Sequence, residues 1–535
     1  MKIKSFTSLL FALFLNMQLQ AQRSVLLIIA DDLGSDYCGF YEDHGDTVKL
    51  PNVRRLLSRG LIFRNAWSNP LCSPTRAGIL TGRHSFRTGV GDVVVSGVPE
   101  LDTNETTIPR LLRAGFPAMR CANIGKWHLS QPGPASFRIP NKMGYHHYEG
   151  SISGALPSYY TWNKVKNGQM TQVNRYATTE NTDNAIAWLK AQGNAPAFLW
   201  LAFNAPHTPY HLPPASLHSF DTLSGSAASI AANPVLYFKA MSEAMDHEIG
   251  RLFDSLQLFN RWDSTDVVFI GDNGDDVAVA QNAGTGGNSK GGVYQNGVSV
   301  PFIISGPSVM QGGRQSQALV STHDLFATIL EMAGLSAWQN LMPDTLEYDS
   351  RSLMPILRNE TDSIRPWAFT EVFRYSPLPG DGKAMRDKEF KLLDFDNGSQ
   401  KFFHITSDPN ENQDLLMQPL SQEAQLHYEY LCNQMYNLTD MNRFCDLPTA
   451  IPQKTAGFSP LYPNPFRERL PLPGRGPGDL FRLLDARGKE LFWGENPDPK
   501  LAAELPEGLY LLEKISGQNR MVFRLLKTTA ADELR

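Results

Sequence analysis

The sequence is poor in the features that mark several large protein classes. Its 49 Lys and Arg residues against 54 Asp and Glu residues give a net charge of −5, so it lacks the basic excess of a nucleic-acid-binding protein. No run of like charge forms a tail, the His and Cys spacing of a zinc site is missing, and no segment reaches the length of a transmembrane helix. What remains is a globular composition, 42% hydrophobic and 10% aromatic, in a chain of 535 residues that allows more than one domain.

Cysteine is also scarce, with five residues in the whole chain. Cys72 stands in a motif described below, and Cys38 and Cys121 are far apart in the sequence. Cys432 and Cys445 are close enough in sequence to pair in an oxidising compartment, but spacing alone leaves that pairing open.

The first 21 residues have the pattern of a secretory signal peptide. Lys2 and Lys4 form a basic start, residues 5–15 are a short and mostly apolar core, and Ala21 marks the expected cleavage region. The core is too short to span a membrane, and no cysteine follows it to carry a lipid. We therefore expect a secreted or cell-surface protein.

The most informative stretch is residues 71–84, which read LCSPTRAGILTGRH. Pro74 fixes its own φ and donates no backbone hydrogen bond, which suits a short turn that presents Cys72. The following residues predict a helix whose N-terminus would face an anion, and Arg76 can place its guanidinium fork against anionic oxygens. A lone cysteine would more often be structural, but the whole motif favours a functional one.

A strand that ends in two carboxylates lies near the N-terminus. Residues 24–30 (SVLLIIA) are a continuous apolar run, as expected for a buried parallel strand, and Asp31 and Asp32 follow it directly. The carboxyl ends of such strands are where α/β sheets build ligand sites. Adjacent carboxylates repel each other unless a cation lies between them, so the pair indicates a hard divalent metal; the alternative is a turn with helix-capping duty.

A second predicted strand, residues 266–270, ends in Asp272 and Asn273. With the first pair, these side chains supply four oxygen donors, which is a suitable set for a hard cation. Asp275 and Asp276 come next, and we interpret them as solvated loop charges.

Basic side chains occur in three further motifs. A Gly-Lys-Trp-His string carries Lys126 and His128, which lie on the same side of an extended segment because strand residues alternate. An apolar strand runs into Asn-Ala-Pro-His-Thr-Pro, whose prolines hold His207 on a rigid loop at the rim of the sheet. His211, four residues on, is a weaker candidate, and Lys290 lies in a glycine-rich loop.

These motifs, in this order, resemble the type I sulfatases of the alkaline phosphatase superfamily, from residue 24 to about residue 446. The resemblance implies an α/β fold in which helices flank a large mixed sheet, with a smaller antiparallel α+β subdomain behind it. It also implies that the formylglycine-generating enzyme oxidises Cys72 to formylglycine. The aldehyde would hydrate to a gem-diol; one hydroxyl attacks sulfur and expels the alcohol, and the other loses its proton as sulfate leaves.

The resemblance assigns a role to each motif. Arg76 and Lys126 would contact the diol and sulfate, His128 would stabilise or deprotonate the diol, and His207 and Lys290 would meet the leaving oxygen. The expected ligands of one Ca²⁺ or Mg²⁺ ion are Asp31, Asp32, Cys72, Asp272 and Asn273.

The chain departs from the family pattern after Lys290, where it reads KGGVYQNG. Gln295 replaces the usual glutamate, Asn296 a glycine and Ser299 a later arginine, which changes the expected shape or charge of the nearby cleft. An acidic residue is also usual where Arg54 stands, a change we expect to be structural.

The aromatic stretch at residues 144–162 fits two interpretations equally. Its rings could line a substrate cleft and stack on sugar or aryl groups, or they could pack a loop against the core.

The C-terminal part changes character twice. Short strands and one helix from residue 364 resemble the smaller sulfatase subdomain, and the last part opens on Tyr-Pro-Asn-Pro-Phe and shows alternating strands that predict a small β-sandwich. This tail resembles the sorting domain of the type IX secretion system; a carbohydrate-binding module is the alternative. The expected division is a signal peptide (1–21), a catalytic domain (22–363), a subdomain (364–446), a linker (447–456) and a sorting domain (457–530).

Several functions remain compatible with the motifs. The favoured one is a sulfatase acting on extracellular sulfated carbohydrates, and the alternatives are an arylsulfatase of small substrates and a phosphonate or phosphate monoester hydrolase, since fold alone does not separate them. A non-catalytic binding protein is disfavoured because every expected catalytic position is filled. We expect no nucleic-acid partner.

Overall fold

The computed structural model describes residues 22–41, 46–281 and 288–439, and in the tail residues 479–485, 490–495, 501, 505, 508–516 and 519–527. The chain divides into two compact units, residues 1–413 and 414–535. The expected signal peptide, the linker and the Tyr-Pro-Asn-Pro-Phe segment lie outside the described residues.

A ten-stranded mixed sheet forms the centre of the first unit. In order across the sheet, its strands are β10 (Arg314–Ser321), β2 (Gly60–Trp67), β9 (Phe302–Ser305), β8 (Thr265–Gly271), β1 (Ser24–Ala30), β7 (Ala197–Ala202), β3 (Arg120–Gly125), β4 (His147–Gly150), β5 (Trp162–Lys166) and β6 (Gln169–Val173). The five strands from β8 to β4 run parallel, β9 is antiparallel to both of its neighbours, and β5 and β6 form an antiparallel hairpin at one edge. This architecture confirms the predicted fold class.

Strand β1 shows why its sequence is apolar without interruption. Val25, Leu27 and Ile29 pack into the hydrophobic cluster on one face of the sheet, whereas Leu26 and Ile28 pack into the cluster on the other. A strand that is buried on both faces has no solvent side, so polar alternation is lost.

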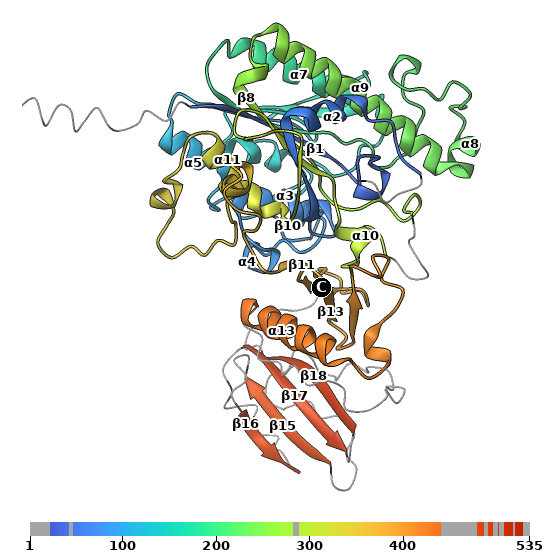
Figure 1. The fold of residues 1–535 in the computed structure, drawn as a ribbon, viewed down its shortest axis with the longest axis vertical. Coiled ribbons are helices and arrows are strands. Elements are labelled where there is room, and N and C mark those ends of the chain that lie inside the picture. Colours follow the sequence, from blue (N-terminus) through green and yellow to red (C-terminus); the bar gives the residue numbers. More distant parts are fainter. Residues whose placement is uncertain are drawn as a thin grey trace, which may run out of the picture. The chain divides into compact units, whose positions relative to one another are not determined.

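Helices cover both faces of this sheet (Figure 1). On one face lie α3 (Cys72–Thr81), α5 (Ile108–Gly115) and α11 (Leu325–Met332), and on the other lie α2 (Pro51–Arg54), α7 (Ala177–Ala191) and α9 (Pro234–Leu258). The shorter helices of this unit are α4 (Ser85–Thr88), α6 (Ile139–Lys142), α8 (Ala227–Ala232), α10 (Gln295–Val298) and α12 (Met354–Leu357).

A second, smaller sheet belongs to the same unit. Its antiparallel strands are β11 (Ala368–Val372), β12 (Gly382–Arg386), β13 (Phe390–Phe395) and β14 (Gln400–His404). The sheet shares a hydrophobic cluster with Trp67 and Leu71, just before the Cys72 motif. The expected subdomain boundary at residue 364 precedes this sheet, whereas the compact units divide after residue 413.

The second unit contains helix α13 (Gln422–Leu438) and an antiparallel sheet. The strand order is β16 (Glu490–Gly494), β15 (Leu480–Asp485), β17 (Gly508–Ser516) and β18 (Asn519–Lys527). The described residues of the tail thus supply one sheet of the expected sandwich. Cys432 on α13 is disulfide-bonded, and Cys445 lies outside the described residues, so their pairing stays a prediction. Among the helices described, none has the length and hydrophobicity to cross a membrane.

Candidate active site and metal centre

The predicted site residues gather at one edge of the central sheet. Strands β8, β1, β7 and β3 are parallel neighbours, so their carboxyl ends meet there. The residues that follow these ends are Asp272 and Asn273 after β8, Asp31 and Asp32 after β1, His207 after β7, and Lys126 and His128 after β3. Cys72 begins α3, Arg76 follows one turn later, and Lys290 lies in the loop before α10.

The oxygen donors of this edge form one cluster. The Asp32 backbone N–H donates to Asp272 Oδ1 at 3.2 Å, and Asn273 Nδ2 donates to Asp32 Oδ1 at 2.7 Å. Donor atoms of Asp31, Cys72 and Asp272 lie within 4.8 Å of one another. Asp31 Oδ1 and Asn273 Oδ1 are buried and have no hydrogen-bond partner in the described part of the chain. Because unpaired buried oxygens are costly, this donor set fits a hard divalent cation.

Each of the three carboxylates has a basic partner, and two of these partners, Arg76 and Lys126, are fully buried. These pairs are Arg76 with Asp272 (2.9 Å from Nε and 2.7 Å from Nη2), Lys126 with Asp31 (2.5 Å) and Lys290 with Asp32 (2.7 Å). The positive and negative charges are equal in number, so a bound divalent cation would leave the cluster positively charged. Such a site attracts an anionic substrate.

Neighbouring basic side chains stabilise the ionised form of Asp32. Burial would raise the pKa of this carboxyl, but His207, Lys290 and Lys126 together lower the pKa below its usual value. Burial would likewise lower the pKa of Lys290, yet the charge of Asp32 raises that pKa. The pair is therefore ionised across the physiological pH range.

Cys72 lies against His128, with 3.1 Å between its Sγ and the Nδ1 of the ring. Burial raises the pKa of the Cys72 thiol even though Lys126 and Lys290 act against this shift. Burial and the neighbouring cations lower the pKa of His128 well below its usual value. The unmodified Cys72 side chain is therefore a neutral thiol beside a neutral imidazole. A neutral thiol is a poor nucleophile.

His128 reaches Cys72 by a turn. The strand ends at Gly125, and His128 has a left-handed backbone with φ of +55°. Strand alternation was therefore the wrong reason for placing Lys126 and His128 on one side, although both side chains do enter the site. The imidazole is covered by Gly154, where a Cβ atom would lie 2.2 Å from the His128 Cε1.

His207 faces the carboxylates from the loop after β7. Its Nε2 lies 3.6 Å from Asp32 Oδ2, and its Nδ1 lies 2.7 Å from the Thr208 carbonyl oxygen. The hydroxyl of Tyr159 donates to the carbonyl oxygen of His207 at 2.7 Å. The weaker candidate His211 packs against Tyr159, with 4.2 Å between the ring centroids. It therefore belongs to the cluster of aromatic side chains that includes Tyr159.

The interpretation of Asp275 as a solvated charge is wrong. Its side chain is buried, and its Oδ1 accepts a hydrogen bond from the Gly34 backbone at 2.8 Å. Burial and the neighbouring Asp36 carboxyl raise the pKa of Asp275 well above its usual value. Asp275 thus fastens the loop after β8 to the loop after β1, while Asp276 is half-buried.

The residues that replace family positions fasten the segment after Lys290. Gln295 Oε1 accepts a hydrogen bond from Trp67 Nε1 at 3.2 Å, and Ser299 Oγ lies 2.9 Å from Ser35 Oγ. Asn296 Nδ2 donates to a backbone carbonyl at 2.8 Å. The residues at these three positions therefore help to hold the segment after Lys290 in place.

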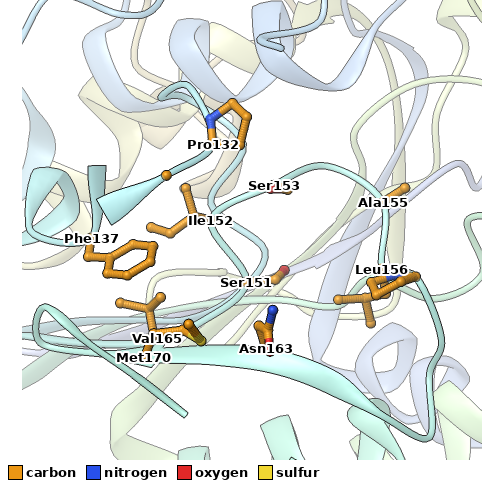
Figure 2. A pocket seen from close by; sticks show the side chains of 12 residues that line it. Pro132, Phe137, Ser151, Ile152, Ser153, Ala155, Leu156, Asn163, Val165 and Met170 are labelled. Atoms are coloured by element: carbon orange, nitrogen blue, oxygen red, sulfur yellow. The ribbon is translucent and has the colours of Figure 1, made fainter. Parts of the chain in front are cut away.

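In the aromatic stretch at residues 144–162, the buried rings pack into the core, and side chains without aromatic rings line a pocket. Tyr145, Tyr148, Tyr159 and Trp162 are buried. The segment 151–157 lines a pocket of about 280 Å³, and Figure 2 shows mainly apolar side chains around it. The pocket is lined by Pro132, Gly133, Phe137, Ser151, Ile152, Ser153, Ala155, Leu156, Pro157, Asn163, Val165 and Met170. One segment therefore both covers His128, through its glycine, and lines this pocket.

Sequence reasoning missed Gly154, Tyr159 and Ser73 as parts of the site. Ser73 Oγ donates to the His128 carbonyl oxygen at 2.8 Å and accepts from the Val94 backbone at 3.1 Å. Ser73 lies inside the Cys-x-Pro-Thr-Arg motif, so its position was a usable signal. Nothing in the sequence around the other two residues indicates their contacts.

Two family models match successive parts of the chain. Residues 23–335 match the family model described as Sulfatase, and residues 287–439 match the one described as N-sulphoglucosamine sulphohydrolase, C-terminal. The N-acetylgalactosamine-6-sulfatase of Homo sapiens is 28% identical over 380 residues, which span 62% of this chain and 65% of the human protein.

Solved structures share the fold. The crystal structure of Ps i-CgsB in complex with k-i-k-neocarrahexaose has a TM-score of 0.66 and 23% identity, covering 78% of this chain and 93% of that chain. The structure of BT4656 in complex with D-glucosamine-2-N,6-O-disulfate has a TM-score of 0.63 and 21% identity, covering 79% of this chain and 99% of that chain.

Proposed function

Because this chain belongs to the sulfatase family, whose members are sulfuric ester hydrolases, we propose that it hydrolyses sulfate esters of extracellular carbohydrates. One observation carries the proposal: Cys72, at the N-terminus of α3, lies beside the carboxylates of Asp31 and Asp272, which have the buried basic partners Lys126 and Arg76. A helix N-terminus favours an anionic group, and so does the net positive charge that a bound divalent cation would give the cluster. These features support the proposal that a sulfate group binds beside Cys72.

We propose that Cys72 acts as formylglycine. The Cys-Ser-Pro-Thr-Arg string supports this modification, and the neutral, buried thiol supports it as well, because an unmodified Cys72 would be a weak nucleophile. The hydrated aldehyde supplies a hydroxyl that can attack sulfur. His128 is placed to hold or accept a proton at this position, since its Nδ1 lies 3.1 Å from Sγ.

A Ca²⁺ or Mg²⁺ ion is the proposed cofactor. Asp31, Asp32, Asp272 and Asn273 would hold it, with the modified Cys72 side chain beside them, and the two unpaired buried oxygens support this donor set. When bound, the ion polarises a sulfate oxygen and helps a hydroxyl lose its proton. Metal analysis of purified protein should find one divalent ion per chain, and Asp272→Asn should lose that ion; full activity after exhaustive chelation would contradict the assignment.

The other basic residues bind the anion and serve the leaving group. Arg76 is fixed by Asp272 and by the Lys126 carbonyl oxygen, so its guanidinium is held rigidly beside the nucleophile. His207 and Lys290 approach the same carboxylate, Asp32, from separate loops. They are therefore the candidate proton donors to the departing sugar oxygen, a poor leaving group that needs one.

The substrate class rests on the relatives and on the expected export. The human relative is named for a sulfated amino sugar, and two structural neighbours were solved with sulfated or carrageenan-type saccharides. The test measures product release from defined sulfated oligosaccharides, 4-nitrophenyl sulfate and 4-nitrophenyl phosphate. We expect sulfate release from a saccharide to be fastest; faster phosphate release would favour the phosphomonoesterase alternative, and activity on the aryl ester alone would favour a small-substrate arylsulfatase.

Export of the enzyme is a further part of the proposal. Residues 1–21 would direct passage across the inner membrane, and the tail from residue 457 would engage the type IX secretion machinery. N-terminal sequencing of the protein from the producing cells should find cleavage near Ala21. Deleting residues 457–535 should leave an active enzyme inside the cell envelope, whereas unchanged export would contradict the role of the tail.

A further inference from the structure

One phenol bonds to both ends of the turn that carries His207, in addition to the backbone bonds from the Asp31 N–H to the Ala205 carbonyl and from the His207 N–H to the Asn204 carbonyl. The side chain of Tyr159 is 2% exposed, and its hydroxyl donates to the carbonyl oxygens of Asn204 at 2.5 Å and His207 at 2.7 Å. A hydroxyl has one hydrogen, so the two carbonyls share it. Tyr159 therefore joins both ends of the turn that presents His207 to the site.

The ring of Tyr159 is itself held in place. It packs against His211 in a tilted arrangement with 4.2 Å between the ring centroids, and the centroid of the Tyr176 ring lies 6.2 Å away. His211 is in turn fixed, because its Nδ1 lies 3.0 Å from the Pro209 carbonyl oxygen and its Nε2 lies 3.2 Å from the Tyr176 hydroxyl. Removing only the Tyr159 hydroxyl should thus leave the ring in place and loosen the two carbonyl groups that it holds in the His207 turn.

The orientation of His207 depends on the same stretch of backbone. Its Nδ1 lies 2.7 Å from the Thr208 carbonyl oxygen, so Nδ1–H donates there and Nε2 points to the site, 3.6 Å from Asp32 Oδ2. The carbonyl that Tyr159 holds is one residue away from the carbonyl that orients the ring. A shift of this backbone would turn or displace Nε2.

We propose that Tyr159 is a positioning residue for the proton-donating histidine, a role that rests on the function proposed above. Its hydroxyl contacts two backbone carbonyls of the His207 turn, and it acts by fixing the backbone at both ends of this turn. Losing one hydrogen bond and its alignment should lower kcat on a sugar sulfate about ten-fold with little change in KM. Cleavage of 4-nitrophenyl sulfate should change less than about two-fold, because its leaving group departs without much help from an acid.

The experiment compares Tyr159→Phe with Tyr160→Phe in the full-length enzyme. Tyr160 is a matched control: its hydroxyl donates to the Leu212 carbonyl at 2.7 Å, and its ring belongs to the same cluster, but it holds the chain beyond the His207 turn. We expect Tyr160→Phe to match the unaltered enzyme on both substrates. Equal losses of the two substrates in Tyr159→Phe, or no loss on the sugar sulfate, would overturn the proposal.

A second readout does not depend on turnover. In protein labelled with ¹³C-histidine, the imidazole signal of His207 can be assigned by its absence in His207→Ala. Tyr159→Phe should shift or broaden this signal and leave in place the signals of the histidines that do not contact Tyr159, which also shows that the variant is folded. The His211 ring lies against Tyr159, so its signal does not serve as a control. An unchanged His207 signal would overturn the positioning role. If the unaltered enzyme released no sulfate from any ester, the proposed function would be refuted, and the His207 signal would still test the role of Tyr159.

Discussion

Replacing Gly154 by alanine should disable the site without touching any reactive group. Gly154 is buried over the imidazole of His128, and a Cβ atom there would lie 2.2 Å from Cε1, 2.5 Å from Nε2 and 2.7 Å from Nδ1. The His128 backbone is held as well, because its N–H donates to the Ile152 carbonyl at 3.0 Å and Ser73 donates to its carbonyl. The ring and the new methyl group cannot both stay in place.

The size of the effect follows from these distances. Moving Cε1 from 2.2 Å to 3.4 Å, where ordinary contacts begin, requires a displacement of about 1.2 Å. His128 Nδ1 lies only 3.1 Å from Cys72 Sγ, so a shift of that size breaks the contact or compresses it. Misplacing a catalytic group by about 1 Å costs about 100-fold in rate, which corresponds to about 2.7 kcal/mol of activation free energy.

The assay measures kcat/KM for sulfate release by Gly154→Ala and by a matched control, Gly225→Ala. The nearest atom to a Cβ at Gly225 is Leu212 Cδ2 at 3.9 Å, an ordinary contact, so this control should keep full activity. Mass spectrometry of the Cys72 peptide checks that both variants are equally modified. Full activity of Gly154→Ala would refute the view that His128 is fixed against the nucleophile by this glycine.

Three further changes test other parts of the structure. Arg76→Lys keeps the charge but loses the two-pronged contact with Asp272, so kcat/KM should fall about 100-fold. Burial lowers the pKa of His84 to about 4. Below pH 6.5 the unfolded chain therefore binds more protons at this residue than the folded chain, and the free energy of unfolding falls as the pH drops towards 4. His84→Phe should remove about 3 kcal/mol of this loss when the free energy of unfolding is measured against pH. Lys391→Met leaves the carboxylate of Glu411 buried without its partner at 2.6 Å, which should lower the free energy of unfolding by about 3 kcal/mol in chemical denaturation.

The positions of the reactive residues were readable from the sequence for a physical reason. Strand β1 covers Ser24–Ala30, the same residues as the apolar run, because burial on both faces leaves an uninterrupted signal. Residues directly after such strands must lie at the rim of the sheet, which is where Asp31, Asp32 and Asp272 are found. The order of the ten strands was not readable, because it depends on pairing between segments distant in sequence.

The supporting contacts were harder to predict. In the sequence, Asp275 looks like a loop charge. Only the tertiary structure shows that it is buried, with a hydrogen bond from the Gly34 amide and the Asp36 carboxyl beside it. The left-handed turn at His128 has no sequence signature comparable to a glycine. Tyr159 lies in a stretch rich in aromatic residues, and its two carbonyl partners are more than forty residues away, at separations of 45 and 48. A local sequence pattern cannot predict contacts between residues so far apart in the sequence.

The central claim is that Cys72 carries the reaction as formylglycine, and mass spectrometry of the Cys72 peptide from active enzyme tests it most directly. The fraction of the peptide that carries the aldehyde should rise and fall with the specific activity of each preparation, and Cys72→Ala should release no sulfate. A fully active preparation in which every copy of this peptide carries an unmodified cysteine would contradict the account.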